Sequence, residues 1–468
     1  MWRFKDYKNN IAALDDLGNR ITYEELACLE EQFANICGRK ICFILCHNSI
    51  GSLAGYVSMV NARVVPVMIA DDIDRELLDN LLNTYMPEFL WIPGERTSEF
   101  PDTETVLSQY GYSLQRTKYN CMDDLYDELA LLLTTSGSTG SPKLVRQSYD
   151  NIRSNTESIV KYLELDSTER PITTLPMNYT YGLSIINSHL YVGATILLTD
   201  KALMQKQFWA FFKSQNATSF GGVPYTYEML KKLRFFRMEL PSLRTMTQAG
   251  GKLIPELHKE FAQYALDTGR KFVVMYGQTE ATARMAYLPS EKALEKAGSM
   301  GIAIPGGTFS LIDADGNEII DADVVGELVY EGKNVTLGYA EKREDLIIGD
   351  ERNGRLETGD MAKRDSDGYY YIVGRKKRFL KIFGKRVNLD EIDGLVKAKF
   401  SGVECASTGV DDKLYIFVND SKILLEVKDY IVDKIHINPV AISAKYIDVI
   451  PKNDSGKTLY VELEKYYD

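Results

Sequence analysis

The sequence has no apolar stretch that approaches the roughly 20 residues of a membrane-spanning helix. Its first residues, Met1-Trp-Arg-Phe-Lys-Asp-Tyr-Lys, hold no apolar core of the kind that a signal peptide needs. Basic residues are outnumbered: the net charge is −11, whereas a general nucleic-acid binder needs a basic face that displaces counterions. We therefore expect a cytoplasmic protein with no membrane span and no nucleic-acid partner.

Paired cysteine motifs are also lacking. None of the six cysteines forms a C-x-x-C, although four lie within 28–46 and His47 follows directly. A metal site is one interpretation of this cluster. We favour the other, buried thiols in a helix and in a strand at 41–46, because the cluster is embedded among apolar residues and free cysteine behaves as a small hydrophobe.

An α/β pattern runs along most of the chain, without internal repeats or low-complexity tracts. Thr22 is the expected N-cap of the first amphipathic helix, because Glu25 follows three residues later and completes a capping box. Apolar runs alternate with amphipathic segments, which predicts doubly wound α/β sheets. The expected strands are 41–46, 64–69, 89–92, 195–199, 220–223 and 271–276, and the expected helices are 77–85, 150–162, 208–214 and 256–268.

The composition changes twice in the second half of the chain, whose 468 residues suffice for about three domains. Short β patterns between Asp-Gly and glycine-rich turns predict a small β-barrel or β-rich subdomain over about 298–374. At 375–386, seven of twelve residues are basic and none is acidic. We expect a large N-terminal domain at 1–374, a hinge at 375–378 and a small, mobile α+β domain at 379–468.

The most specific chemistry lies in the loop 134–143. Its sequence, Thr-Thr-Ser-Gly-Ser-Thr-Gly-Ser-Pro-Lys, follows an apolar run and holds six hydroxyls, two glycines and one lysine. Glycine lets the backbone approach an anion closely, and hydroxyls, backbone N–H groups and Lys143 can all bind phosphate. The spacing is not the Gly-x-x-x-x-Gly-Lys-Ser/Thr of a P-loop NTPase. A near match to that motif at 451–458 has Pro451 in place of the first glycine, and too few residues follow it for an NTPase domain.

Two shorter polar motifs could contribute to a nucleotide site. Tyr276-Gly-Gln-Thr-Glu280 follows a predicted strand, where the ring can stack on a base, Thr279 can contact phosphate and Glu280 can hold Mg²⁺. Thr358-Gly-Asp360 is expected between two strands, where an acidic residue suits the paired hydroxyls of a ribose. Taken alone, the first motif is more often a turn with a solvated glutamate and the second a β-turn.

The order of these motifs resembles that of the adenylate-forming superfamily, which includes acyl-CoA synthetases, luciferase-like ligases and the adenylation domains of peptide synthetases. The resemblance covers essentially the whole chain. Its motifs, in order, are Ile21-Thr-Tyr-Glu-Glu-Leu26, Thr135-Ser-Gly-Ser-Thr-Gly-Ser-Pro-Lys143, Leu175-Pro-Met-Asn-Tyr-Thr-Tyr-Gly-Leu183, Ala249-Gly-Gly-Lys-Leu253, Tyr276-Gly-Gln-Thr-Glu280, Gly326-Glu-Leu, Gly338-Tyr, Thr358-Gly-Asp360, Gly374-Arg375 and Ser455-Gly-Lys457. Each motif that is weak alone is supported by the others.

The resemblance implies an ATP-dependent, AMP-forming carboxylate ligase. A small carboxylic acid would attack the α-phosphate of ATP, release pyrophosphate and form an acyl-AMP, whose acyl group a thiol then accepts. Charge on the crowded phosphate would be neutralised by Mg²⁺, lysine and loop donors. The acceptor would be CoA or the phosphopantetheine of an acyl carrier protein; the basic segment 375–386 suits an acidic carrier and the 3′-phosphate of CoA equally.

The resemblance also assigns roles to residues of the nucleotide site. The pyrophosphate loop would comprise Thr135, Ser136, Gly137, Ser138, Thr139, Gly140 and Lys143. The adenine would be framed by Gly250, Gly251 and Tyr276, and Gly277 and Gln278 belong to the same nucleotide-binding set. Thr279 would contact the α-phosphate and Glu280 would hold Mg²⁺. Asp360 and Arg375 would bind the ribose hydroxyls.

Further roles fall on the predicted mobile domain. Arg386 would approach phosphate, and Lys457 would bridge the acyl carboxylate and the α-phosphate during adenylation. Lys377 stands at the hinge position of the family. Rotation there would withdraw Lys457 and bring the segment 381–384, with Lys381, to the active site. The alternative for Lys377 is a solvated basic turn.

The acyl pocket departs from the family pattern. Tyr179 stands where many acyl-CoA synthetases carry histidine, and Thr180 stands where amino-acid-activating relatives carry the aspartate that pairs with the substrate ammonium. An α-amino acid substrate is therefore disfavoured. The predicted pocket residues are Tyr179, Thr180, Gly182, Phe220, Val223, Tyr225, Gln248, Ala249 and Gln278. Arg284 could receive a second anion of the substrate, but we favour a surface arginine.

Two other functions remain as alternatives: an amino-acid-adenylating ligase and a non-catalytic nucleotide-binding homologue. Lys143, Glu280, Asp360 and Lys457 are all present, and a homologue without catalysis has no need to keep all four. An ATP–pyrophosphate exchange assay with a panel of carboxylic acids separates these possibilities.

Overall fold

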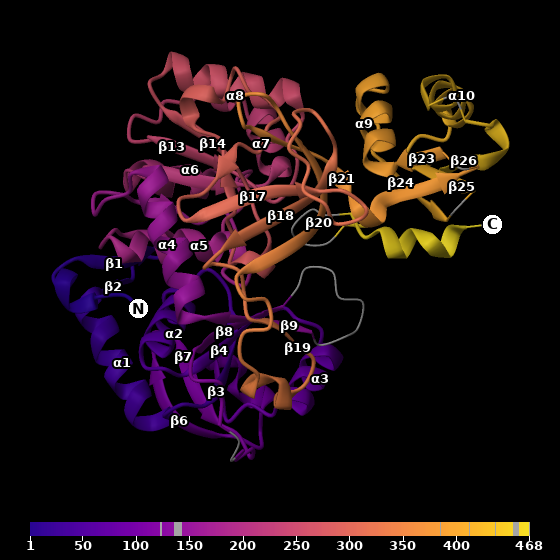
Figure 1. The fold of residues 1–468 in the computed structure, drawn as a ribbon. Helices are drawn as coiled ribbons and strands as arrows, with labels where there is room; N and C mark the ends of the chain where they lie inside the picture. Colours follow the sequence, from indigo (N-terminus) through magenta and orange to yellow (C-terminus); the bar gives the residue numbers. More distant parts are fainter. Residues whose placement is uncertain are drawn as a thin grey trace. The chain divides into compact units, whose positions relative to one another are not determined.

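The computed structural model describes residues 1–121, 124–134, 143–383, 385–410, 412–435, 437–452 and 458–467. These form a multi-domain α/β structure (Figure 1), which confirms the fold class predicted from the sequence. The chain divides into two compact units: unit 1 comprises Met1–Thr308 and Glu331–Leu356, and unit 2 comprises Phe309–Tyr330 and Glu357–Asp468. The hinge at 375–378 stays a prediction. Among the described residues, no helix combines the length and the apolar character needed to cross a membrane.

Unit 1 contains a nine-stranded sheet with the order β16-β15-β14-β13-β12-β10-β11-β1-β2. The pairs from β14 through β12, β10 and β11 to β1 are parallel, as the predicted doubly wound pattern requires, and the pairs at both ends are antiparallel. The strands are β1 (Ile11–Asp15), β2 (Arg20–Thr22), β10 (Pro171–Ile172), β11 (Ile196–Leu198), β12 (Ser219–Gly222), β13 (Thr245–Gln248), β14 (Lys271–Tyr276), β15 (Ala286–Tyr287) and β16 (Ile302–Ala303).

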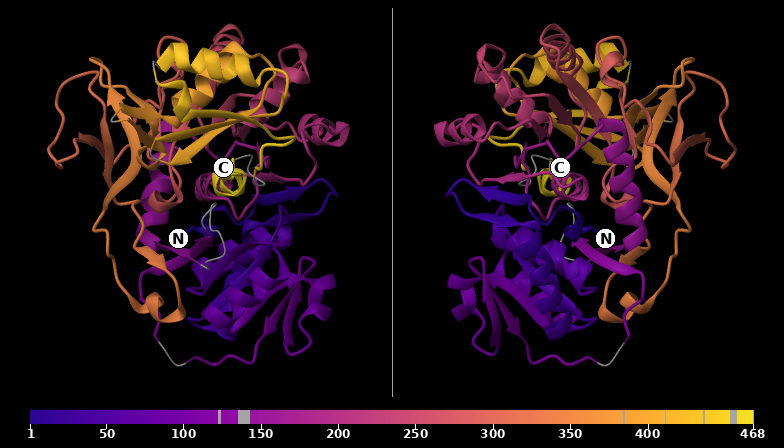
Figure 2. Two further views of the ribbon diagram at one scale, coloured as in Figure 1. Left: turned by 90° about the vertical axis from the view of Figure 1, so that its right-hand side faces the viewer. Right: turned by 90° about the vertical axis from the view of Figure 1, so that its left-hand side faces the viewer.

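The second large sheet of unit 1 has eight strands in the order β19-β9-β8-β4-β3-β5-β7-β6. Its centre, β8-β4-β3-β5, is parallel. The strands are β3 (Ile41–Cys46), β4 (Val65–Ala70), β5 (Phe89–Pro93), β6 (Glu104–Gln109), β7 (Tyr112–Arg116), β8 (Leu129–Thr134), β9 (Leu144–Ser148) and β19 (Gly338–Ala340). In the side views of Figure 2, most of the purple strands of this sheet form a layer separate from the magenta elements of the nine-stranded sheet.

Helices lie beside and between these two sheets. Thr22 caps the first of them with the predicted capping box: its side chain accepts from the backbone of Glu25, whose carboxylate accepts from the backbone of Thr22. The helices of unit 1 are α1 (Tyr23–Cys37), α2 (Ile50–Asn61), α3 (Arg75–Tyr85), α4 (Tyr149–Leu163), α5 (Thr180–Tyr191), α6 (Lys206–Ser214), α7 (Pro224–Lys232) and α8 (Pro255–Asp267). Those predicted from the sequence agree with these bounds to within two residues.

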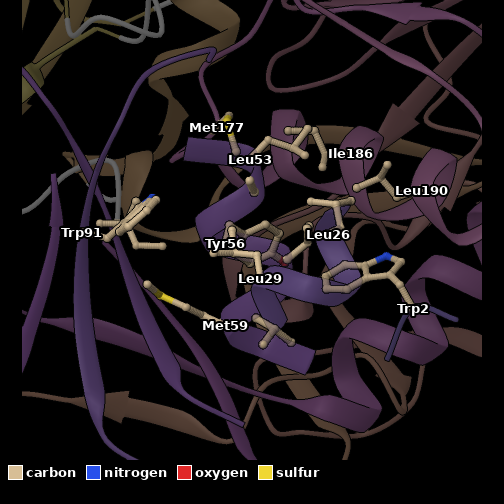
Figure 3. Close-up of a cluster of buried hydrophobic side chains, with 14 of the residues drawn as sticks. Trp2, Leu26, Leu29, Leu53, Tyr56, Met59, Trp91, Met177, Ile186 and Leu190 are labelled. Atoms are coloured by element: carbon tan, nitrogen blue, oxygen red, sulfur yellow. The ribbon is translucent and has the colours of Figure 1, made fainter. Parts of the chain in front are cut away.

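A large apolar core joins the two sheets through α1, α2 and α5. Side chains of all three helices meet there, as Figure 3 shows for Leu26, Tyr56 and Ile186. Two polar groups inside this core are satisfied by one residue: Trp2 Nε1 donates to the backbone oxygen of Asn187 at 3.1 Å, and the hydroxyl of Tyr56 donates to its Oδ1 at 3.0 Å. Buried polar atoms that are paired in this way carry little penalty.

Unit 2 contains most of a four-stranded sheet and the C-terminal elements. The four-stranded sheet, in the segment predicted to be β-rich, has the order β17-β18-β20-β21, and its closure into a barrel stays a prediction. The strands of this sheet are β17 (Gly307–Ile312), β18 (Gly326–Gly332), β20 (Arg355–Arg364) and β21 (Tyr370–Arg375). The C-terminal elements form a two-stranded sheet of β22 (Phe379–Ile382) and β23 (Lys385–Asn388), and a three-stranded sheet of β24 (Cys405–Val410), β25 (Lys413–Val418) and β26 (Ile442–Tyr446). Helices α9 (Leu389–Lys399) and α10 (Leu424–Ile435) pack on an apolar core of the last three strands.

The cysteine cluster follows the buried-thiol interpretation with one exception. Cys37, Cys42 and Cys46 are buried, but Cys28 is exposed, because it lies on the side of α1 that faces away from the core. Within the described ranges, no group of three or more histidine, cysteine, aspartate or glutamate residues is placed to hold a metal ion.

Candidate nucleotide and acyl site

The predicted pyrophosphate loop connects two antiparallel strands. Residues 135–142, and with them Thr135–Gly140, lie outside the described residues. Their flanks are described: β8 pairs with β9, and Thr134 lies opposite Leu144. A P-loop instead connects a strand to a helix. The hairpin therefore agrees with the interpretation that this is a different phosphate-binding loop.

Lys143, at the end of that loop, and Glu280 both contact one residue, Tyr339. The Lys143 Nζ lies 3.8 Å from the centroid of the Tyr339 ring and 3.6 Å from Oε1 of Glu341. The hydroxyl of Tyr339 donates to Oε1 of Glu280 at 2.7 Å. Arg352 lies over the same ring, 4.7 Å from its centroid, and its Nη1 donates to the backbone oxygen of Glu280 at 3.0 Å. We call Lys143, Glu280, Tyr339 and Arg352 the Tyr339 cluster.

The Tyr339 cluster holds Glu280 in place while leaving part of its carboxylate free. Burial, followed by the nearby Glu280 charge, raises the pKa of Tyr339 to about 12, so its hydroxyl remains a donor at neutral pH. The backbone oxygen of Glu280 also accepts from the amide and hydroxyl of Thr336, both at 3.0 Å. Within the described part of the chain, Oε2 of Glu280 has no hydrogen bond and the carboxylate no ion pair. A single free carboxylate oxygen beside a lysine suits Mg²⁺, which is usually held by one or two carboxylates plus substrate phosphates.

The glycines predicted to frame the adenine lie after β13, Gly250 close to Tyr179 and Gly251 close to Pro224. Gly250 has a φ of 82°, and a Cβ there would stand 2.6 Å from the hydroxyl oxygen of Tyr179. Both constraints exclude larger residues. Gly277 is required for another reason: a Cβ would lie 1.5 Å from the backbone oxygen of Ala283. Tyr276, at the end of β14, accepts a hydrogen bond from Gln278 at 3.3 Å. Thr279 and Glu280 follow in a single 3₁₀ turn, Thr279–Ala281.

The predicted acyl-pocket residues divide between the two faces of the nine-stranded sheet. The ring of Tyr179 lies 6.3 Å from that of Tyr181 on α5. The Tyr181 hydroxyl lies 2.8 Å from Oγ1 of Thr247. Phe220 is instead packed against Tyr227, whose ring centroid is 6.4 Å away. Of the other predicted pocket residues, Gln278 is half-buried and Tyr225 is 57% exposed, and the buried ones are Thr180, Gly182, Val223, Gln248 and Ala249.

Arg284 corrects the sequence interpretation. We expect a surface arginine there, but only 2% of the residue is exposed. Its Nε donates to Oγ of Ser184 at 3.1 Å and its Nη1 to the hydroxyl of Tyr162 at 3.0 Å. The guanidinium carbon lies 5.3 Å from the ring centroid of Tyr181. Residues 282–284 lie between β14 and β15, and the amide of Met285 donates to the backbone oxygen of Tyr276 at 2.9 Å. No local sequence pattern reveals that the arginine is buried.

In unit 2, the two residues predicted to bind ribose form an ion pair. Asp360 and Arg375 are opposite one another on β20 and β21, and Nε of Arg375 lies 2.7 Å from Oδ1 of Asp360. The Asp360 side chain is 3% exposed and that of Arg375 is 55% exposed. The expectation that Thr358–Asp360 connects two strands is wrong, because all three residues lie inside β20. A mid-strand glycine made that stretch resemble a turn.

The predicted residues of the mobile domain are only partly described. Lys377 belongs to the 3₁₀ turn Lys376–Arg378, and Lys381 and Arg386 are Cα partners in the β22–β23 hairpin, but the side chains of all three lie outside the description. Lys457 lies outside the described residues altogether.

Three basic residues of the segment 375–386 have acidic partners. Arg375 pairs with Asp360, Lys376 with Glu327 at 2.6 Å, and Arg378 with Asp390 and Asp393 at 2.6 and 2.9 Å. Their charge is therefore less available to a partner than the sequence indicated.

Sequence reasoning assigned no role to Tyr339, Arg352, Tyr181 or Thr247. Gly338-Tyr entered only as one motif in the series, and Arg352 carries no local signal. Their contacts exist only in the folded chain. Tyr339 contacts Lys143 and Glu280, and Arg352 contacts Glu280. Tyr181, whose hydroxyl meets Thr247, lies beside Tyr179.

Comparison with known proteins agrees with this geometry. Residues 2–340 match the model of the family described as AMP-binding enzyme. Among curated proteins, a feruloyl-CoA synthase from Amycolatopsis sp. is 28% identical over 356 residues, 73% of this chain and 70% of the relative. An oxalate–CoA ligase from Saccharomyces cerevisiae is 27% identical over 350 residues, 70% of this chain and 62% of the relative.

Solved structures share the fold over nearly the whole chain. ATP-bound MatB from Rhodopseudomonas palustris aligns with a TM-score of 0.78 at 22% identity, covering 99% of this chain and 96% of the other. The o-succinylbenzoate CoA synthetase of Bacillus subtilis, in complex with its acyl-adenylate intermediate, aligns with a TM-score of 0.79 at 21% identity, covering 98% and 97%.

Proposed function

The chain belongs to the family of AMP-binding enzymes, and from this we propose that it is an ATP-dependent, AMP-forming acid–thiol ligase. Its substrate is a small carboxylic acid, which it activates as an acyl-AMP with release of pyrophosphate. The matching relatives are named as CoA ligases, which supports the same reaction class here.

The observation that carries the proposal is the Tyr339 cluster. Lys143 and Glu280 come from distant motifs, and both contact Tyr339. A lysine and a partly free carboxylate beside one loop are what binding of a metal–triphosphate needs. This arrangement supports adenylation by a working enzyme rather than a non-catalytic homologue, since nucleotide binding alone does not require an oriented carboxylate.

In the proposed first step, an oxygen of the acid attacks the α-phosphorus of ATP, and the bond to the β-phosphate breaks. Lys143 and the loop 135–142 would hold the departing β- and γ-phosphates. Glu280, oriented by Tyr339, would hold Mg²⁺, which supplies charge neutralisation on the phosphates when bound. In the second step, a thiolate attacks the acyl carbon and AMP leaves.

We propose CoA as the acceptor thiol. The names of the relatives favour it, and the acidic partners of Arg375, Lys376 and Arg378 weaken the electrostatic case for an acidic carrier protein. A carrier phosphopantetheine is the second candidate: turnover with a carrier, a KM that rises steeply with salt, and no turnover with CoA would select it. The cytoplasmic location stays a prediction.

The amino-acid-adenylating alternative finds no support in the described pocket. An α-amino acid needs an acidic partner for its ammonium group. Thr180 occupies the expected position, and the positive charge of Arg284, 5.3 Å from the ring of the next residue Tyr181, would repel an ammonium group.

The test is ATP–pyrophosphate exchange with a panel of carboxylic acids, followed by AMP release on addition of CoA. K457A should lose exchange while ATP binding changes little. Lys452, which pairs with Glu404 at 2.8 Å, provides the matched control: K452A should retain exchange. Full exchange in K457A would reject the role of Lys457, and absence of exchange with every acid would reject the ligase.

A further inference from the structure

Arg284 differs from the other buried arginines of the described chain. Three arginines there are at most 2% exposed: Arg146, Arg284 and Arg343. Arg343 pairs with Oε1 of Glu88 at 2.7 Å, and Arg146 pairs with Glu351. Arg284 has no acidic partner among the described residues, and its Nη2 makes no hydrogen bond to any of them.

Every described neighbour of the Arg284 guanidinium is neutral. The contacts are Ser184, Tyr162, the ring of Tyr181 and Sδ of Met275, which lies 3.2 Å from Nη1. Burial raises the pKa of both Tyr162 and Tyr181, so neither hydroxyl becomes a phenolate at neutral pH. A buried cation without a counter-charge is costly, and an incoming anion would relieve that cost.

The backbone of Arg284 is held by side chains from two other segments. Its carbonyl oxygen accepts from Nδ2 of Asn155 at 2.7 Å and from Nδ2 of Asn334 at 3.1 Å. The two preceding residues, Thr282 and Ala283, have φ values of 51° and 88°, in the left-handed region that non-glycine residues avoid. Strain of this kind persists where the surroundings enforce it, and it gathers at functional sites.

A line of contacts connects Arg284 with the predicted adenine frame. The Tyr179 hydroxyl stands over Gly250, the ring of Tyr179 lies 6.3 Å from that of Tyr181, and Arg284 lies over Tyr181. A small acid whose reacting carboxylate meets the nucleotide would therefore extend past Tyr181 toward Arg284.

We propose that Arg284 binds a second carboxylate of the substrate, so that the acid activated by this enzyme is a short dicarboxylic acid. Tyr181 and Ser184 on α5 and Tyr162 on α4 position the guanidinium. The inference rests on the proposed ligase function, and it adds the class of acid.

The experiment measures pyrophosphate exchange with dicarboxylic acids of two to six carbons and with the monomethyl ester of each. Wild type should prefer a diacid over its monoester by at least tenfold in kcat/KM. R284Q should lose at least tenfold on the diacid and change little on the monoester, and R284K should fall between. Equal losses on both substrates, or wild-type preference for monoesters, would overturn the proposal while leaving the ligase intact.

Two measurements without turnover separate this inference from the ligase function and from a purely structural arginine. Diacids should raise the Tm of wild type but not of R284Q. If wild type shows this Tm shift but no pyrophosphate exchange, the anion site is supported and the ligase function is not. If diacids do not shift the Tm of wild type, the anion site is rejected. Unliganded R284Q should keep or raise its Tm, whereas R343Q should lower it, because buried Glu88 loses its 2.7 Å partner and keeps only Lys40, at 3.8 Å. A Tm loss in R284Q as large as in R343Q would identify Arg284 as structural.

Discussion

The hydroxyl of Tyr339 is the sharpest test of the Tyr339 cluster. Y339F removes only the oxygen that donates to Oε1 of Glu280 at 2.7 Å and keeps the ring that faces Lys143 and Arg352. A hydrogen bond to a charged group contributes about 1.5–3 kcal/mol, which corresponds to roughly tenfold to a hundredfold in an equilibrium constant. We expect the Mg²⁺ concentration for half-maximal pyrophosphate exchange to rise by that factor, because Glu280 is no longer oriented.

Two controls isolate this effect. The hydroxyl of Tyr191 donates to Oε1 of Glu157 at 2.9 Å on the surface of unit 1, so Y191F removes the same type of bond elsewhere and should leave the Mg²⁺ dependence unchanged. In an E280Q background, Y339F should add little, because contacting residues that act as a unit are not additive. A shift below twofold in Y339F, or an undiminished shift in the E280Q background, would refute the reasoning.

Three further predictions concern unit 2, the hinge and pH. D360N should weaken ATP binding about tenfold or more by titration calorimetry; the change in Tm should be small, because Arg375, the partner that loses its counter-charge, has a side chain that is 55% exposed. Unchanged affinity would remove Asp360 from the site. K377P should impair thioester formation more than adenylation, and equal loss of both would count against a hinge. Burial lowers the pKa of His189 and His258 to about 4, below the usual 6.5, so the unfolded chain takes up their protons first. The free energy of unfolding should then fall as pH drops from about 6.5 toward 4, by on the order of 3 kcal/mol per histidine. H189Q should reduce this dependence of the unfolding free energy on pH, measured by denaturant titrations. An unchanged dependence in H189Q would contradict the lowered pKa of His189.

Local patterns predicted elements that carry a capping signal or a short, continuous apolar run. The capping box at Thr22 and the apolar run at 41–46 are signals contained in a few residues, and both elements form where expected. Helix α2 was not predicted because every residue from Ile50 to Val60 is buried, so its sequence has no amphipathic period. Helix α2 is buried on all sides because it packs against strands of both sheets.

Site residues could be predicted when they belong to one motif, or when the family resemblance assigns two distant residues to the same ligand. Asp360 and Arg375 were assigned to one ribose together, and the structure places them opposite one another. Tyr339 could not be assigned, because its role depends on contacts with Lys143 and Glu280 that only the folded chain makes. Arg284 was misread for the same reason: arginine is usually exposed, and only the fold shows where a chain buries one.

The Tyr339 cluster and the proposed acid-binding Arg284 share the segment after β14, which supplies both Glu280 and Arg284, but their remaining contacts come from different elements. The guanidinium of Arg284 is positioned by Tyr162 on α4 and by Ser184 on α5, and neither residue belongs to a phosphate-binding motif. The Tyr339 cluster draws on β19, on the turn at Glu280 and on the end of the loop 134–143. Substitutions around Arg284 should therefore alter which acid is activated while the Mg²⁺ dependence of exchange stays constant. That separation explains physically how chains that share the phosphate motifs can differ in the acid they take.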